Sequence, residues 1–117
     1  MRRSNNIKTY LDGFLSIYRP QEIYSNFGAK KNIRSLDNLD FLYKLAYTQS
    51  YKRMQDLEYA ESIGKDLSLK VKCRLVQGVK TSDKVVINNV LYDIIQLDED
   101  RYNQELYIYL EECYLVE

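Results

Sequence analysis

The stretch Lys84–Glu112, KVVINNVLYDIIQLDEDRYNQELYIYLEE, carries the strongest structural signal in the chain. Two apolar runs, Val85 to Leu97 and Leu106 to Leu110, flank a polar segment from Asp98 to Gln104. The first run is rich in β-branched and aromatic residues, and Asn88-Asn89 inside it tolerates the positive φ angles of a two-residue hairpin turn. The stretch therefore predicts strand, turn, strand, loop and strand, a meander typical of small β-barrels.

A long strand is predicted upstream by strict alternation between Leu67 and Leu75. Apolar side chains occupy the odd positions, whereas the even positions hold Ser68, Lys70, Lys72 and Arg74. A period of two residues is typical of a strand with one buried face. We expect this strand to present a basic outer face.

The residues before this strand have helical spacing. Met54, Leu57, Ala60 and Ile63 recur every three residues, and Gly64 suits the left-handed turn after a helix. Further strands are predicted at 41–47, from alternation, and at 14–18, where Pro20 ends the run. Between the two lies a basic segment that contains Gly28.

These elements predict a mainly β fold, a small antiparallel β-barrel or a compact sandwich of about five to six strands. One short α-helix is expected at about 54–63 and a long loop at about 22–40. A length of 117 residues fits a single domain, 1–117, and we expect residues 1–10 to form a flexible N-terminal arm.

The formal net charge is zero, with 17 Lys and Arg against 17 Asp and Glu, which argues against a surface built wholly to neutralise phosphates. Residues 1–60 hold ten basic and six acidic residues, and 61–117 hold seven and eleven, so the halves carry +4 and −4. Either charges simply sit where strands face water, or oppositely charged flanks meet on neighbouring subunits.

The sequence has no signal for catalysis, a cofactor or a metal. It contains no histidine, and Cys73 and Cys113 lie outside any Cys-x-x-Cys motif, so we expect reduced, partly buried thiols. The acidic groups at 98–100 and 111–112 fall in a predicted turn and near the chain end, where a structural role is favoured. No secretory leader or membrane-spanning run is recognisable. We expect a protein that is not an enzyme and does not bind membranes.

Tyrosine is the unusual residue of the composition, with twelve copies and no tryptophan. Tyr107 and Tyr109 alternate with aliphatic residues, so they form a candidate exposed tyrosine face if the aliphatic side faces the core. Such a face is ordinary amphipathic surface, a protein interface or a stacking platform for bases.

The order of several segments resembles the head-closure (head–tail joining) proteins of long-tailed phages of Gram-positive bacteria. The resemblance covers nearly the whole chain from about Leu11, and its most specific part is a helix-to-strand segment followed, after a spacer, by strand, turn and a Tyr-rich strand. The segments that carry it are Phe14-Leu15, FGAKKN (27–32), KLAY (44–47), RMQDLEYAE (53–61), LSLKVK (67–72), LYDI (91–94), DEDR (98–101) and ELYIYLE (105–111).

The resemblance implies a structural virion protein, assembled in the bacterial host cytoplasm, that forms a ring below the portal and adaptor. Such a ring closes the DNA-filled capsid and gives the tail a docking surface. The implied partners are other copies of the chain, portal and adaptor proteins, a tail-terminator or tail-completion protein, and the packaged double-stranded DNA.

Two groups of residues are candidates for these contacts. Lys30, Lys31 and Arg34 in the long loop are expected to face the DNA channel. The surface of the predicted helix is expected to touch a neighbouring subunit or the adaptor, through Tyr51, Arg53, Asp56, Glu58 and Tyr59. The alternatives are a solvated loop and a helix that caps one barrel opening. An adaptor, a tail-completion protein and a barrel that binds single-stranded nucleic acid remain alternative functions.

Overall fold

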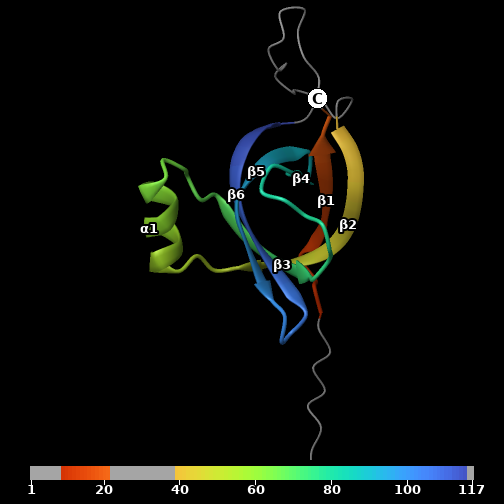
Figure 1. Ribbon diagram of the computed structural model, residues 1–117, viewed down its shortest axis with the longest axis horizontal. Helices are drawn as coiled ribbons and strands as arrows, with labels where there is room; N and C mark the ends of the chain where they lie inside the picture. Colours follow the sequence, from red (N-terminus) through yellow and green to blue (C-terminus); the bar gives the residue numbers. More distant parts are fainter. Residues whose placement is uncertain (1–8, 22–38, 116–117) are drawn as a thin grey trace, which may run out of the picture.

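A computed structural model describes residues 9–21 and 39–115 of the chain, together with the side chains up to residue 113. Within these residues it contains a single α-helix and six strands, which confirms the mainly β prediction (Figure 1). The helix is α1 (Met54–Ser62) and the strands are β1 (Gly13–Pro20), β2 (Leu39–Ser50), β3 (Leu69–Arg74), β4 (Lys84–Ile87), β5 (Val90–Asp100) and β6 (Glu105–Leu115).

The six strands form a closed antiparallel barrel in the order β1-β2-β3-β6-β5-β4. Strand β1 closes the ring because it pairs with β2 on one side and with β4 on the other. Every strand thus has two neighbours, which leaves no long open edge for uncontrolled pairing. Of the two architectures that the sequence allowed, the barrel is the one observed.

The predicted meander is present, with one boundary corrected. Asn88 and Asn89 adopt φ angles of 51° and 65°, as a tight hairpin turn requires, between β4 and β5. The second turn is shorter than predicted, because Asp98 to Asp100 continue β5 and pair with the start of β6. Only residues 101–104 form this turn, in which Gln104 has a φ of 56°.

The barrel interior is filled by alternate apolar side chains from all six strands, supplemented by Val76. Leu15 and Ile17 of β1 and Val71 and Cys73 of β3 are fully buried there. Burial of a side chain of this size contributes roughly 1.5–3 kcal/mol. The remaining core members are Leu45, Tyr47, Val76, Val85, Ile87, Ile94, Leu106, Ile108 and Leu110.

Two bulges change which side chains face the interior. Opposite Ile17 and Tyr18, β2 carries one extra residue, so Phe41 turns outward although it alternates in step with the buried Leu45 and Tyr47. A second register shift in β5 sends Ile94 inward and Ile95 outward. Period-two reasoning fails at both positions because a bulge reverses the parity of the strand.

Helix α1 lies against the outside of the barrel (Figure 1). Ala60 packs there with Leu67 and Tyr109, and Ile95 and Tyr107 extend this second apolar cluster. Past the helix end Gly64 adopts a φ of 72°, and the Lys65 amide donates to the Ala60 carbonyl at 2.8 Å. The sequence prediction of a helix at 54–63 that ends at glycine is confirmed to within a residue.

The segment between β3 and β4, residues 75–83, crosses the barrel and packs Val76 and Val79 against its core (Figure 1). The fully buried Asp83 holds this segment, since it accepts two bonds from the Arg19 guanidinium at 3.0 Å and one from the Lys80 amide at 2.8 Å. Residues 1–8 and 22–38 lie outside the described residues, and with them most of the expected arm and loop. The structure changes one boundary of each predicted segment. At the end of the predicted arm, the Tyr10 hydroxyl donates to the Glu105 carboxylate at 2.9 Å, and at the end of the predicted loop, residues 39–40 belong to β2.

Candidate functional site

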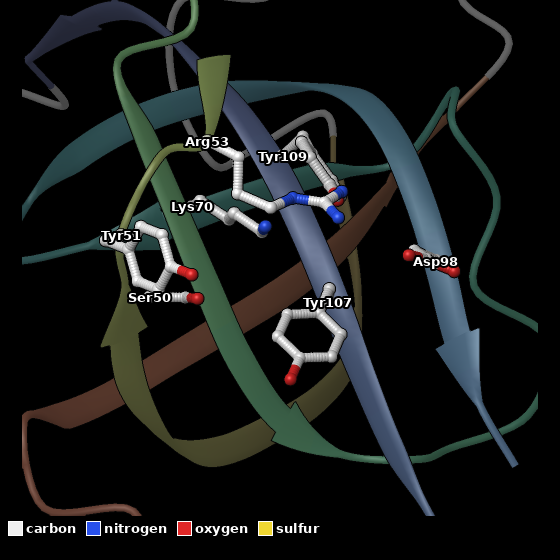
Figure 2. A pocket seen from close by; sticks show the side chains of 7 residues that line it. All are labelled: Ser50, Tyr51, Arg53, Lys70, Asp98, Tyr107 and Tyr109. Atoms are coloured by element: carbon white, nitrogen blue, oxygen red, sulfur yellow. The ribbon is translucent and has the colours of Figure 1, made fainter. Parts of the chain in front are cut away.

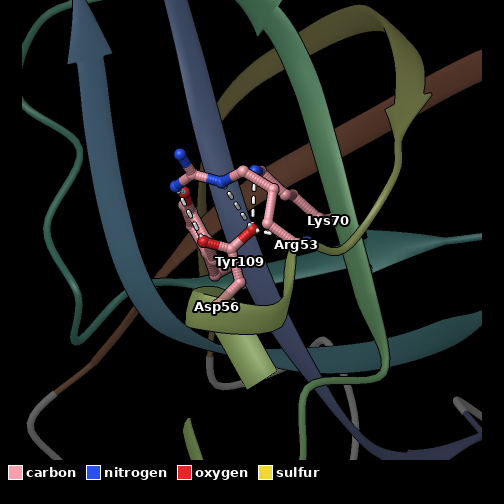
Figure 3. A network of polar contacts seen from close by, with 4 residues as sticks. All are labelled: Arg53, Asp56, Lys70 and Tyr109. Carbon is pink, nitrogen blue, oxygen red and sulfur yellow. Dashed lines mark hydrogen bonds and ion pairs between the residues drawn. The ribbon is translucent and has the colours of Figure 1, made fainter. Parts of the chain in front are cut away.

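A buried ionic cluster fastens helix α1 to the barrel. It consists of Arg53, Asp56, Lys70 and Tyr109, here called the Asp56 cluster (Figure 3). The Asp56 carboxylate accepts bonds from Lys70 Nζ at 2.8 Å and from the Arg53 guanidinium at 2.8 and 3.2 Å. It also accepts the Arg53 backbone N–H at 3.0 Å, which satisfies a free donor at the helix start. One carboxylate therefore joins the helix to β3.

The protonation of this cluster follows from its partners. Burial opposes ionisation of Asp56, but hydrogen bonds from Arg53 and Lys70 outweigh it and hold the pKa of the carboxyl well below its ordinary value. Burial likewise opposes the charge on Lys70, yet the bond to Asp56 raises the pKa of its ammonium above the ordinary value. Both groups are therefore charged at neutral pH, and the cluster carries one net positive charge.

Lys70 is the largest departure from the sequence prediction. Its side chain points outward from β3, as alternation required, but only 5% of it is exposed because α1 covers it. The ammonium lies 5.4 Å from the ring centroid of Tyr107 and 4.9 Å from that of Tyr109. Desolvated cation–π contacts of this kind contribute roughly 2 kcal/mol each. The expected basic outer face is therefore wrong at Lys70.

The candidate exposed tyrosine face is corrected in the same way. Tyr107 and Tyr109 point outward from β6, but Tyr109 is only 3% exposed, because Ala60 and Leu67 cover it. Its hydroxyl accepts a long bond from Arg53, at 3.5 Å. Tyr107 is half-buried at the edge of the same cluster. These two tyrosines serve first to seat the helix.

Beside the cluster the barrel surface has a hollow of about 230 Å³ (Figure 2). Side chains from four strands and from the segment before α1 line it: Ser50, Tyr51, Arg53, Lys70, Asp98, Tyr107 and Tyr109. The Arg53 and Lys70 cations and the tyrosine rings line one part of the hollow, and the carboxylate of Asp98 lies at the rim on the other side (Figure 2). The hollow can therefore accept a planar or polar group of a partner.

Four of the five helix-surface residues singled out from the sequence are exposed: Tyr51, Arg53, Glu58 and Tyr59. The fifth, Asp56, is buried, so its placement on the exposed side is wrong. The reason is the Asp56 cluster, which draws the carboxylate toward Lys70. Lys30, Lys31 and Arg34 lie outside the described residues.

Helix α1 also carries an outward-facing apolar surface that was not predicted. Met54 and Leu57 share helical spacing with the buried Ala60, yet Met54 is 68% exposed and Leu57 is exposed as well. The buried line of α1 runs instead through Asp56 and Ala60, four residues apart. The small side chain of Ala60 was the available signal, since it permits close approach of a helix to a sheet.

The acidic groups outside the Asp56 cluster have mainly structural partners. Glu111 accepts the Asp66 amide at 2.8 Å, and Asp100 accepts the Asn103 amide at 3.1 Å in the second turn. Cys73 is buried and Cys113 is exposed, both as free thiols. Among the described residues no three His, Cys, Asp or Glu side chains gather into a metal-binding group. In the same part of the chain, no helix has the length and apolar character needed to cross a membrane.

Comparison with protein-family models finds no match to this chain, and comparison with curated proteins finds none either.

Proposed function

We propose that this chain is a structural subunit of a phage head–tail connector, which forms a ring below the portal and adaptor. In this role it closes the DNA-filled capsid and offers the tail a docking surface, and it performs no catalysis. The proposal rests on the resemblance of the sequence to head-closure proteins. The structural observation that supports it best is a closed barrel whose outer helix is fixed on its inner side but keeps apolar side chains in solvent.

A helix built for stability alone would direct its apolar residues toward the barrel. In α1 the barrel side is held by charge, through the Asp56 cluster, whereas Met54 and Leu57 face outward. Exposed apolar side chains that gather on one element are typical of protein interfaces. The helix is thus well suited to bind another protein of an assembly while staying rigidly attached to its own barrel.

The test uses DNA-filled, tail-less heads that carry portal and adaptor but not this chain. Purified protein is added, the connector is imaged, and the DNA retained after incubation is measured. We expect an additional ring of density at the connector and reduced DNA leakage relative to heads without added protein. Absence of added density with unchanged leakage would contradict the proposal, and binding to isolated tails instead would support a tail-completion role.

The contribution of the basic loop is tested on the same heads. Replacement of Lys30, Lys31 and Arg34 by Glu is expected to increase leakage, because negative charge near the channel repels DNA. The matched control makes the same change in charge at three exposed positions elsewhere, Lys52, Lys65 and Arg101. Equal DNA retention by both triple variants would remove the channel role from the loop.

The hollow favours one second candidate function, a barrel that binds single-stranded nucleic acid. Tyrosine rings beside Arg53 and Lys70 are the groups on which bases stack. Lys70, however, is already paired with Asp56, and Asp98 adds negative charge to the rim. Binding of the isolated protein to oligonucleotides, measured at several salt concentrations, decides the matter. Tight, salt-sensitive binding that Tyr107→Ala abolishes would favour this candidate over the connector role.

A further inference from the structure

The outer surface of β1 and β2 carries an exposed aromatic patch. Phe14, Tyr18, Phe41 and Lys44, here called the β1–β2 face, share the outer side, since Phe14 pairs with Ala46 and Tyr18 pairs with Phe41. Phe14 is 62% exposed and Phe41 57% exposed. Their neighbours order them: the Tyr18 and Phe41 rings meet edge to face at 5.8 Å, and Lys44 Nζ lies 5.2 Å from the Phe14 centroid. Ordered aromatic rings left in solvent indicate an interface.

Helix α1 carries a complementary surface on its side away from the barrel. Met54, Leu57, Glu58 and Glu61, here called the outer stripe, are spaced i, i+3, i+4 and i+7 and therefore share one helix face. All four are exposed, and they lie opposite the buried line of Asp56 and Ala60. The outer stripe thus combines two flexible apolar side chains with two carboxylates.

The two surfaces match in chemistry. Met54 and Leu57 offer apolar contact to the phenylalanine rings, and thioethers pack favourably against aromatic groups. Lys44 forms no ion pair with any described residue, and neither do Glu58 and Glu61, although other lysines and glutamates of the barrel do. The stripe supplies negative charge and the face supplies positive charge, so a contact between them pairs charges that form no ion pair among the described residues of one subunit.

The two surfaces also have the placement that a repeating contact requires. Helix α1 packs beside β3 and β6, whereas β1 and the part of β2 that pairs with it lie away from α1 (Figure 1). The helix and the β1–β2 face are therefore apart within one subunit (Figure 1). When two different surfaces of one chain bind each other, copies join head to tail, and the series closes into a ring if the rotation allows.

We propose that the outer stripe of one copy packs against the β1–β2 face of the next, with Lys44 paired to Glu58. The contact is heterologous, between identical chains, and its closure into a ring rests on the connector role proposed above. The occupant of the β1–β2 face is thus a second copy of this chain rather than a different connector protein. The head-to-tail direction follows from the two unlike surfaces.

Site-directed crosslinking of the purified full chain tests the contact without phage heads. In a Cys113→Ser background, which leaves only the buried Cys73, one batch carries Ser16→Cys on the β1–β2 face and another carries Glu61→Cys on the outer stripe. The batches differ in mass through a tag and are mixed with a short bismaleimide at high protein concentration. We expect a mixed dimer, with a yield at least about tenfold above control pairs, as a preference of about 1.4 kcal/mol gives.

The control batch carries Tyr102→Cys at the tip of the β5–β6 hairpin, a position 95% exposed and outside both surfaces. Three results would overturn the inference. The first is a mixed-dimer yield no higher than that obtained with the Tyr102→Cys batch. The second and third are a dimer yield from the Ser16→Cys batch alone, or from the Glu61→Cys batch alone, that equals the mixed-dimer yield. The last two would show a symmetric contact instead.

A charge swap sharpens the test and separates it from the connector role. Lys44→Glu and Glu58→Lys should each lower the mixed-dimer yield about tenfold, because like charges then face each other, and their combination should restore it. Restoration without any binding to heads would keep the contact and remove the connector role. Binding to heads that none of these substitutions alters would keep the connector role and remove the contact.

Discussion

Lys70 and Lys44 point outward from neighbouring strands of the barrel, β3 and β2, and they differ in what covers them. Both side chains point outward from a strand, and both ammonium groups lie near aromatic rings, those of Tyr107 and Tyr109 for Lys70 and that of Phe14 for Lys44. Helix α1 covers Lys70 and supplies it with the Asp56 carboxylate. Lys44 stays exposed and has no carboxylate partner among the described residues.

Each of these lysines with its nearby rings is here called a seat: the occupied seat is Lys70 with Tyr107 and Tyr109, and the open seat is Lys44 with Phe14 and Phe41. On the β3–β6 side the chain's own helix α1 covers the lysine, and the Asp56–Lys70 ion pair contributes to the stability of the fold. On the β1–β2 side the lysine and the phenylalanine rings are exposed, so their burial in a contact with another chain would contribute free energy to association. The first seat should therefore respond to mutation through folding and the second through assembly.

The largest expected effect comes from breaking the occupied seat. Asp56→Ala leaves the Lys70 ammonium buried without a partner, which costs roughly 3–5 kcal/mol of unfolding free energy. Lys44→Ala at the open seat should change it by about 0.5 kcal/mol or less, as is usual for exposed positions. Urea unfolding of both variants measures the difference. Equal losses would show that the two seats are not distinct.

Removing both charges of the occupied seat should recover much of that loss. In Asp56→Leu with Lys70→Met, no buried charge is left under α1, since the Arg53 side chain that loses its partner is 45% exposed, and we expect stability within about 2 kcal/mol of the original chain. Urea unfolding in parallel with the Asp56→Ala single variant makes the comparison. A double variant as unstable as the single one would show that the cluster contributes specific geometry beyond charge pairing.

Acid should weaken the occupied seat selectively. The pKa of Asp56 lies below its ordinary value of 3.8 in the folded chain, so the unfolded chain binds this proton more readily. Its contribution is complete above about pH 5 and is lost as the pH falls through 3.8 toward the lower folded value. The stability difference between the original chain and Asp56→Asn should therefore shrink from pH 6 to pH 2. A constant difference across that range would contradict this assignment.

The smallest effect on folding is expected at the open seat. Phe14→Ser with Phe41→Ser removes rings that are already more than half exposed, so unfolding free energy should change by about 1 kcal/mol or less. The same variant should lose the mixed crosslink, because the apolar part of the contact is gone. Calorimetry and crosslinking of one preparation test both statements. A large loss of stability with crosslinking unchanged would reverse the roles of the two seats.

The strands and the hairpin turn were predictable because their signals are local. Alternation located β3, and Asn88-Asn89 defined the turn between β4 and β5. Closure of the barrel was also accessible, since short antiparallel connections favour it. What escaped prediction depends on contacts between distant segments: a bulge turns Phe41 outward, and α1 docks over Lys70 and Tyr109.

The candidate site was predictable only in outline. Exposure of Glu58 followed from helical spacing, whereas burial of Asp56 depends on a lysine fourteen residues away. Spacing grouped Met54 and Leu57 with the buried Ala60, because it shows which residues share a face but not which face meets the barrel. The outer stripe and the β1–β2 face became visible only once the helix and the bulge were placed.

Charge reversal on assembled connectors tests the central claim most directly. DNA-filled, tail-less heads with portal and adaptor receive the original chain, Lys44→Glu, Glu58→Lys or the chain with both substitutions, and retained DNA is measured beside images of the connector. The proposal predicts a ring and DNA retention with the original chain and the double variant, and leakage with each single variant. Retention by all four proteins, or leakage with the double variant equal to that with the single ones, would contradict a ring built by helix α1 on the β1–β2 face.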